Sequence, residues 1–250
     1  MSGHSKWSTI KRKKGAADAK RGKIFSKLSK EIMMAAKTGG GDPSTNLTLK
    51  NAIDKAKQNN LPNDNIDRAI KRGTGEDSDA ASWEEIVYEG YGPGGVAVLV
   101  EALTDNKNRT ASDVRHTFTK IGGKLGKSGT VDYLFTRKGF IQVTKDGIEE
   151  DKIFEVAIES GADEVEDGGE TWDIYTEYTD FNDVKVGIES AGIEIDNSEL
   201  IQQPSNTIKI SGKDAQNMLK MMEMLEDNDD VQNVWANFDI DESEMEAFGD

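Results

Sequence analysis

The chain has 250 residues, no cysteine and a formal net charge of −16. Without cysteine it has no disulfides, thiolate metal sites or cysteine nucleophiles, and no apolar run reaches the length of a membrane span. The charge is unevenly divided, because residues 1–75 hold 17 Lys and Arg against 6 Asp and Glu, whereas residues 76–250 hold 14 against 41. This asymmetry favours an acidic body with a basic module that faces a polyanion.

The first thirty residues are the most basic part of the chain, with ten Lys and Arg against one Asp. Residues 1–22 show little helical hydrophobic pattern, and we expect a flexible basic arm there. Because Lys and Arg release condensed counterions when they neutralise phosphates, we expect this arm to bind nucleic acid, with a solvated tail as the alternative. Trp7 either stacks on an exposed base or packs on the helical domain. The candidate contacts of the arm are Lys6, Trp7, Lys11, Arg12, Lys13, Lys14, Lys20, Arg21 and Lys23.

Residues 23–78 are predicted to form a three-helix domain. Apolar residues recur at helical spacing in segments 24–36, 49–56 and 66–70, and segments 38–41 and 61–63 separate them with glycine or proline. Residues 74–82 form a polar, acidic linker. The third helix adds three nucleic-acid candidates that lie largely off its apolar stripe, namely Arg68, Lys71 and Arg72.

From residue 83 the pattern changes to strands that alternate with helices. Residues 137–204 follow the ferredoxin-like order β-α-β-β-α-β. The segments on either side each indicate β-α-β, with predicted strands at 96–103, 131–135, 207–210 and 231–238. Thr110 and Asp113 are interpreted as the capping box of one helix. We therefore expect a discontinuous α/β domain of residues 79–136 plus 205–240, an inserted domain of residues 137–204 and an acidic tail of residues 241–250.

The predicted fold class is thus α/β (α+β), with an N-terminal helical domain and two ferredoxin-like α/β domains. The methionines at 218, 221, 222 and 224 are interpreted as a stripe that faces the core.

Two glycine-rich segments match nucleotide-binding motifs only formally. The Gly90-x-Gly92-x-x-Gly95 segment joins two strands, so a hairpin turn is expected instead of a dinucleotide site. The loop 122–129 is not a phosphate loop, because Ile121 stands where the first glycine of that motif is required. In addition, a helix precedes the loop, whereas a strand precedes a phosphate loop. The backbone amides and lysines of this loop are still candidates for contacting phosphate without catalysis.

Catalysis, metals and cofactors are not predicted. The two histidines, His4 and His116, lie apart and make no metal cluster. No catalytic triad or paired general acid and base stands out. We therefore predict no catalytic residues, no metal site and no cofactor.

A second basic stretch lies within the acidic body, where residues 105–138 hold eight Lys and Arg against three acids. Polar side chains on the helix face opposite Phe118 suit phosphate or sugar contacts, and a solvated helix face is an equal alternative. The secondary phosphate-contact candidates are Arg109, Arg115, His116, Lys120, Lys124 and Lys127.

Several specific motifs lie along the chain. They include Gly3-His4-Ser5-Lys6-Trp7, Tyr88-Glu89-Gly90-Tyr91-Gly92-Pro93-Gly94-Gly95, Asn108-Arg109-Thr110 and Gly122-Gly123-Lys124-Leu125-Gly126. In these motifs the chain resembles the YebC/PmpR family, to which the mitochondrial translational activator of cytochrome oxidase subunit one also belongs. The resemblance implies three domains around a cleft and a cytoplasmic, non-enzymatic regulator of gene expression.

The same resemblance leaves two roles open. Family members are described as DNA-binding transcriptional regulators and as ribosome-associated translation factors that help at proline-rich stalls. We take transcriptional regulation as the nominal function and translational activation as the alternative. The expected partner is nucleic acid, either DNA or ribosomal or transfer RNA, with the ribosome in the second case and no membrane or metal. The competing class is an enzyme that acts on a phosphorylated ligand in the cleft.

Overall fold

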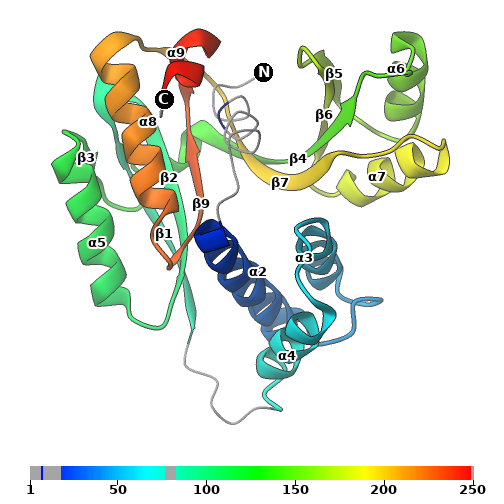
Figure 1. The fold of residues 1–250 in the computed structure, drawn as a ribbon, viewed down its shortest axis with the longest axis horizontal. Helices are drawn as coiled ribbons and strands as arrows, with labels where there is room; N and C mark the ends of the chain where they lie inside the picture. Colours follow the sequence, from blue (N-terminus) through cyan, green and yellow to red (C-terminus); the bar gives the residue numbers. More distant parts are fainter. Residues whose placement is uncertain (1–6, 8–17, 77–82, 249–250) are drawn as a thin grey trace.

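The computed structural model describes residue 7 and residues 18–76 and 83–248. The first unit is helical (Figure 1) and contains α2 (Asp18–Gly39), α3 (Leu47–Gln58) and α4 (Asn63–Gly73). Asn46 joins α2 to α3, because its side chain accepts the N–H of Leu49 at 3.1 Å and donates to the carbonyl of Ala35 at 2.8 Å. Ile32, Leu49 and Ala56 are fully buried between the helices. The three predicted helices are therefore confirmed.

The end of α4 approaches α2 closely because residue 73 is glycine. A Cβ atom at Gly73 would lie 2.2 Å from the carbonyl oxygen of Met33. Any side chain there requires the two helices to move apart. The packing buries Ile66 and Ala69 of α4 and leaves the polar face of this helix in solvent.

The first sheet draws its strands from two distant parts of the chain. Its order is β3-β1-β2-β9, with antiparallel neighbours, and the strands are β1 (Glu84–Tyr91), β2 (Ala97–Thr104), β3 (Lys124–Leu125) and β9 (Val231–Ala236). The strands β1 and β2 form the predicted hairpin, whose turn is the short 3-10 helix η1 (Pro93–Gly95). Two helices, α5 (Lys107–Lys120) and α8 (Gly212–Glu226), cover one face of this sheet (Figure 1). Phe118 and Met218 are fully buried beneath them.

Short elements complete the unit around the first sheet. The strand β8 (Ile208–Lys209) pairs in parallel with β10 (Phe238–Asp239), and α9 (Glu242–Ala247) follows. The predicted strand at 207–210 thus lies in a separate two-stranded sheet. Of the predicted core-facing stripe, the side chains of Met218, Met221 and Met222 are buried, whereas that of Met224 is only partly buried.

Residues 135–204 form the second sheet, whose order β5-β6-β4-β7 is the ferredoxin-like one. Its elements are β4 (Phe135–Thr144), α6 (Glu150–Glu159), β5 (Glu164–Asp167), β6 (Thr171–Glu177), α7 (Phe181–Ser190) and β7 (Asn197–Pro204). Because successive side chains of a strand point to opposite faces, Ile141 and Val143 pack in the core with α6 and α7. Phe140, which directly precedes Ile141 and points to the opposite face, packs with Leu99 and Trp235 of the first sheet.

The three units surround a cleft, as the resemblance to the YebC/PmpR family implies. A cavity of about 490 Å³ opens there, lined by parts of α2, α3, β1, β2, β7 and β9. The domain boundaries set out above stay predictions.

Three local predictions are wrong. Residues 131–135 do not form a strand, because η2 (Asp132–Leu134) is a 3-10 turn and β4 begins only at Phe135. The capping box of Thr110 is wrong as well, since α5 begins at Lys107 and Asn106 caps it by accepting the N–H of Arg109 at 3.1 Å. The predicted flexible arm does not extend to residue 22, because α2 already begins at Asp18 and runs through Gly22.

Candidate nucleic-acid interface

An open groove of about 600 Å³ lies between α2 and α4 in the helical unit. Two aromatic side chains, Phe25 and Trp83, contribute to its lining together with three cations, Lys30, Arg68 and Arg72. Aromatic faces and guanidinium groups are the two kinds of surface that unpaired nucleotides use, for stacking and for phosphate contact. The groove therefore has the chemistry of a nucleotide-binding surface.

Two cations of α4, Arg68 and Arg72, line this groove, and Lys71 precedes Arg72 in the helix. Arg68, Lys71 and Arg72 are all exposed on the polar face of the helix. Among the described residues, the side chains of Arg68 and Lys71 have no polar partner. Both remain available for phosphate, so the structure brings together these predicted residues of the third helix.

Two lysines of α2 are engaged inside the molecule, at the end of α8. Lys27 Nζ donates to the carbonyl of Glu226 at 2.6 Å, and Lys30 Nζ donates to the carbonyl of Asp229 at 2.8 Å. Glu226 is the last residue of α8, so its carbonyl lies at the negative end of the helix dipole, where a cation such as Lys27 is stabilising, whereas Asp229 lies in the turn that follows. These lysines therefore connect the helical unit to the first sheet's unit.

Lys23, a predicted nucleic-acid contact, belongs to the same row. Its Nζ donates to the carbonyl of Asp227 at 3.1 Å and lies 3.3 Å from the carboxylate of that residue. The side chain is 45% exposed, so water screens this ion pair. Contact between Lys23 and nucleic acid stays a prediction, and it requires phosphate to compete with Asp227.

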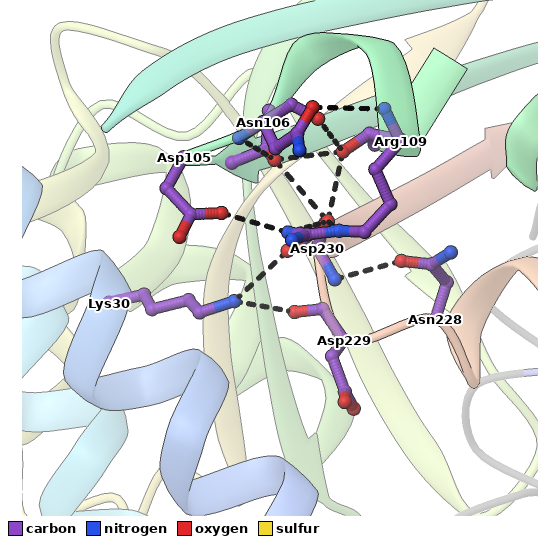
Figure 2. A network of polar contacts seen from close by, with 9 residues as sticks. Lys30, Asp105, Asn106, Arg109, Asn228, Asp229 and Asp230 are labelled. Carbon is purple, nitrogen blue, oxygen red and sulfur yellow. Dashed lines mark hydrogen bonds and ion pairs between the residues drawn. The ribbon is translucent and has the colours of Figure 1, made fainter. Parts of the chain in front are cut away.

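Asp230 is the centre of a polar network beside these lysines (Figure 2). Its Oδ2 accepts from Arg109 Nη2 at 2.7 Å and from Thr110 Oγ1 at 2.9 Å, and Lys30 Nζ lies 3.5 Å from Oδ1. Burial acts to raise the pKa of Asp230, but the bonds from Arg109 and Thr110 and the charge of Lys30 hold that pKa below its ordinary value. Arg109 also donates to Asp105 at 2.8 Å. Arg109, which was predicted to contact phosphate, therefore already binds two carboxylates of the protein, those of Asp105 and Asp230.

Trp7 does not offer its ring to a base in this structure. Its side chain is only 5% exposed and lies in the core of the first sheet's unit with Val98 and Met218. The ring of Phe248 meets it edge to face, with 5.8 Å between centroids. The expected base stacking is therefore wrong for this conformation, and so is packing on the helical domain. The sequence could not show which core would accept the indole.

The other candidate residues of the basic arm have side chains that the structure does not describe. Lys6, Lys11, Arg12, Lys13 and Lys14 lie outside the described residues. Lys20 and Arg21 lie in α2, near its start, but their side chains are also outside the description. Their role in binding nucleic acid stays a prediction.

The glycine-rich loop 122–129 leads into a site that already holds an internal anion. The Glu89 carboxylate, buried under the loop, accepts the N–H of Gly129 at 2.7 Å, of Val131 at 2.7 Å and of Asp132 at 2.9 Å. Burial acts to raise the pKa of Glu89, but the backbone N–H bonds, led by Val131, lower it below its ordinary value. These amides are thus not available to an external phosphate, which corrects part of the expectation for this loop.

Five secondary candidates remain in solvent along α5 and the loop behind it. They have no polar side-chain partner among the described residues, and they are Arg115, His116, Lys120, Lys124 and Lys127. The structure places them on a different unit from the α2–α4 groove. They stay predictions of a secondary phosphate-contact surface.

The cleft between the three units has a different chemistry. Lys55 lies 3.1 Å from Glu31 there, and although burial acts to lower the pKa of Lys55, the charges of Glu31, Glu199 and Glu101 raise it above its ordinary value. The lysine is therefore a paired cation and a poor proton acceptor. The glycine-rich loop 122–129 does not line this cleft.

Sequence reasoning missed four residues that organise these sites: Phe25, Trp83, Glu89 and Asp230. Trp83 offered the clearest signal, because it is an aromatic residue directly after a polar linker. Phe25 was interpreted as core, and it is in fact only half-buried. No sequence pattern indicates that Glu89 or Asp230 would be buried with backbone or arginine donors.

Comparisons with known proteins identify the chain's relatives. The family model of the TACO1/YebC protein N-terminal domain matches residues 5–76, and that of the TACO1/YebC second and third domain matches residues 83–238. A "probable transcriptional regulatory protein" of Geobacter sulfurreducens is 57% identical over 98% of this chain and 99% of its own length. One from Rubrobacter xylanophilus is 56% identical over 98% of both chains.

A solved structure agrees in fold with the chain. The crystal structure of a conserved hypothetical protein from Aquifex aeolicus superposes with a TM-score of 0.82 at 48% identity, covering 90% of this chain and 92% of the other. None of the described helices combines the length and the hydropathy that a membrane-spanning segment requires.

Proposed function

Since the chain belongs to the TACO1/YebC family, we propose that it is a non-enzymatic, cytoplasmic regulator of gene expression that binds nucleic acid. Its nominal role is that of a DNA-binding transcriptional regulator. The observation that carries this proposal is the α2–α4 groove, which is lined by Arg68, an exposed cation that has no polar partner among the described residues. The names of the relatives support a regulatory role.

The uneven distribution of charge favours binding of a polyanion to the helical unit. The basic residues gather in the first 75 positions, and residues 139–250 hold six Lys and Arg against 31 acids. A polyanion is therefore attracted to the helical unit and repelled by the ferredoxin-like unit. Phosphate contacts of this kind position the protein without reading sequence.

A second role, translational activation on the ribosome, is favoured by the composition of α4. A recognition helix in a DNA major groove reads bases with the residues near its N-terminus. In α4 those positions include the acids Asp64 and Asp67, both exposed, while the cations lie in its second half. This arrangement suits shape-based contact with RNA better than base reading in duplex DNA. Relief of stalls at proline runs is the form that this alternative takes.

Crosslinking in cells, followed by sequencing of both DNA and RNA, separates these roles. Enrichment at promoters that is lost with Arg68→Ala supports transcriptional regulation. Recovery on ribosomal or transfer RNA, with stalling at proline runs when the protein is absent, supports the alternative. The matched control is Lys152→Ala, which removes one exposed cation from the ferredoxin-like unit. Equal, background-level recovery by wild type and Arg68→Ala on both polymers contradicts nucleic-acid binding.

The contribution of the arm is best tested by substitution. Deleting residues 2–22 would also remove Trp7 from the core and cut the start of α2. Exchanging Lys11, Arg12, Lys13 and Lys14 for glutamine leaves both in place. A large loss of affinity with an unchanged melting temperature is the expected result, and unchanged affinity contradicts a role for the arm.

A further inference from the structure

We propose that the α2–α4 groove holds one unpaired nucleotide of a single-stranded nucleic acid, with its base against Phe25 and Trp83 and its phosphate on Arg68. This inference rests on the proposed function and makes it more specific, because it names the form of nucleic acid that the helical unit binds. It also assigns a role to Trp83 and Phe25.

The dimensions and lining of the groove fit this occupant. A volume of about 600 Å³ lies within the range of about 300 to about 1,000 Å³ that small-ligand sites occupy. The lining combines Phe25, Trp83 and the Met33 side chain with cations at Arg68 and Arg72. A free phosphate ion would not use the aromatic part, and an apolar ligand would not use the arginines. A nucleotide uses both.

Trp83 is held in position by α2 even though it follows the linker. Lys30 Nζ lies 4.7 Å from the centroid of its indole ring, and Lys37 Nζ donates to its carbonyl at 3.3 Å. Lys30 is itself fixed by the carbonyl of Asp229 and by Asp230. The indole is therefore oriented before any ligand arrives, which lowers the entropy cost of stacking.

The geometry selects against duplexes. A paired base is stacked on both sides within its helix, so it reaches a groove of this kind only after it leaves the stack. Unpaired bases expose their faces and stack on aromatic side chains with little regard to sequence. Single strands, loops and ends are the expected ligands, whether of RNA or of DNA.

The test is a fluorescence-anisotropy titration of the full chain with a labelled nine-nucleotide oligo-adenylate, as RNA and as DNA, and with a blunt duplex of the same length. Base–aromatic stacking is worth about 1–3 kcal/mol per base, so Trp83→Ala and Phe25→Leu should each weaken single-strand binding by about 5- to 100-fold. Duplex binding should change by less than about twofold. The matched control is Tyr133→Ala, which removes an aromatic residue that is 71% exposed on another unit.

A second measurement uses only the wild-type protein, so that a folding defect cannot mimic the effect. Replacing successive nucleotides of the single strand with abasic residues should give one position at which affinity falls about as far as in Trp83→Ala. Trp83 belongs to none of the hydrophobic cores of the described chain, so its alanine variant should keep the wild-type melting temperature.

The outcomes separate this inference from the proposed function. If Trp83→Ala, Phe25→Leu and the abasic strands all bind like their references while Arg68→Ala binds weakly, the groove holds no base and the proposed function stands. If an acidic peptide of glutamates competes as well as the single strand does, the groove is a protein-docking surface and the inference is overturned. If the wild type binds none of the nucleic acids, the proposed function itself fails.

Discussion

Glu89 shows how one buried carboxylate organises a loop at the scale of single residues. Backbone amides that point at one spot form an anion site, and here the chain supplies the anion itself. The turn at residues 132–134 follows from these bonds, because the chain must bend to present successive amides to one carboxylate. A strand at 131–135 was predicted from alternating apolar residues, and alternation carries no information about an acid forty residues away.

Replacing Glu89 with glutamine should destabilise the protein by about 2 kcal/mol. The NH2 group of glutamine would face backbone N–H donors that the carboxylate now accepts from, so buried donors would lose their acceptor. The pKa of Glu89 is lowered in the folded state, so its contribution is present above the unfolded-state pKa and is lost as the pH falls through the folded-state value. Urea unfolding between pH 3 and pH 7 measures both effects. The control is Glu85→Gln on the same strand, which is exposed. An equal change in both variants contradicts the role of Glu89.

Asp230 offers a second residue-scale test. Asparagine at this position keeps the shape but removes the charge that Arg109 and Lys30 face. We expect Asp230→Asn to lower the free energy of unfolding by about 2 kcal/mol, since bonds to charged groups are worth about 1.5–3 kcal/mol. Asp229→Asn should change it by less than about 0.5 kcal/mol, because the Asp229 side chain is exposed and Lys30 contacts only its carbonyl oxygen. Equal stabilities of the two variants would refute this role.

At the scale of elements, packing between α2 and α4 sets the shape of the groove. The sequence was sufficient to predict these helices, because their apolar spacing, Asn46 and the glycines all agree. It was insufficient to predict the groove, since its lining depends on how closely α4 approaches α2 and on where Trp83 lies after the linker. The row of lysines on α2 was interpreted as a polyanion surface, whereas part of it contacts the end of α8. A pattern of charged residues indicates the sign of the partner's charge but does not identify the partner.

Two glycines of the helical unit should respond in opposite directions to alanine. Gly73→Ala places a Cβ atom against a backbone carbonyl and should cost about 2 kcal/mol through overpacking. Gly22→Ala meets nothing within 4 Å inside α2 and should stabilise by up to about 1 kcal/mol, the difference in helix propensity. Thermal unfolding measures both. Stabilisation by Gly73→Ala would show that the helices do not pack as described.

At the scale of the whole molecule, an acidic protein presents a basic, aromatic-lined groove in its helical unit. The β-α-β-β-α-β succession of residues 135–204 could be predicted because local periodicity indicates each element. The cleft and the Asp230 network could not, because they depend on how the three units meet. The acids that line the cleft and the charge of the second half direct a polyanion toward the helical unit.

The most direct measurement is the salt dependence of affinity for a single-stranded oligonucleotide, in wild type and in Arg68→Ala. If about six cations contact phosphates, the slope of log K against log salt should be near −4 on a single strand. Arg68→Ala should reduce its magnitude by about 0.7, and Lys152→Ala should leave it unchanged. A wild-type slope near zero, or the same slope in Arg68→Ala as in wild type, would contradict binding of nucleic acid through the helical unit.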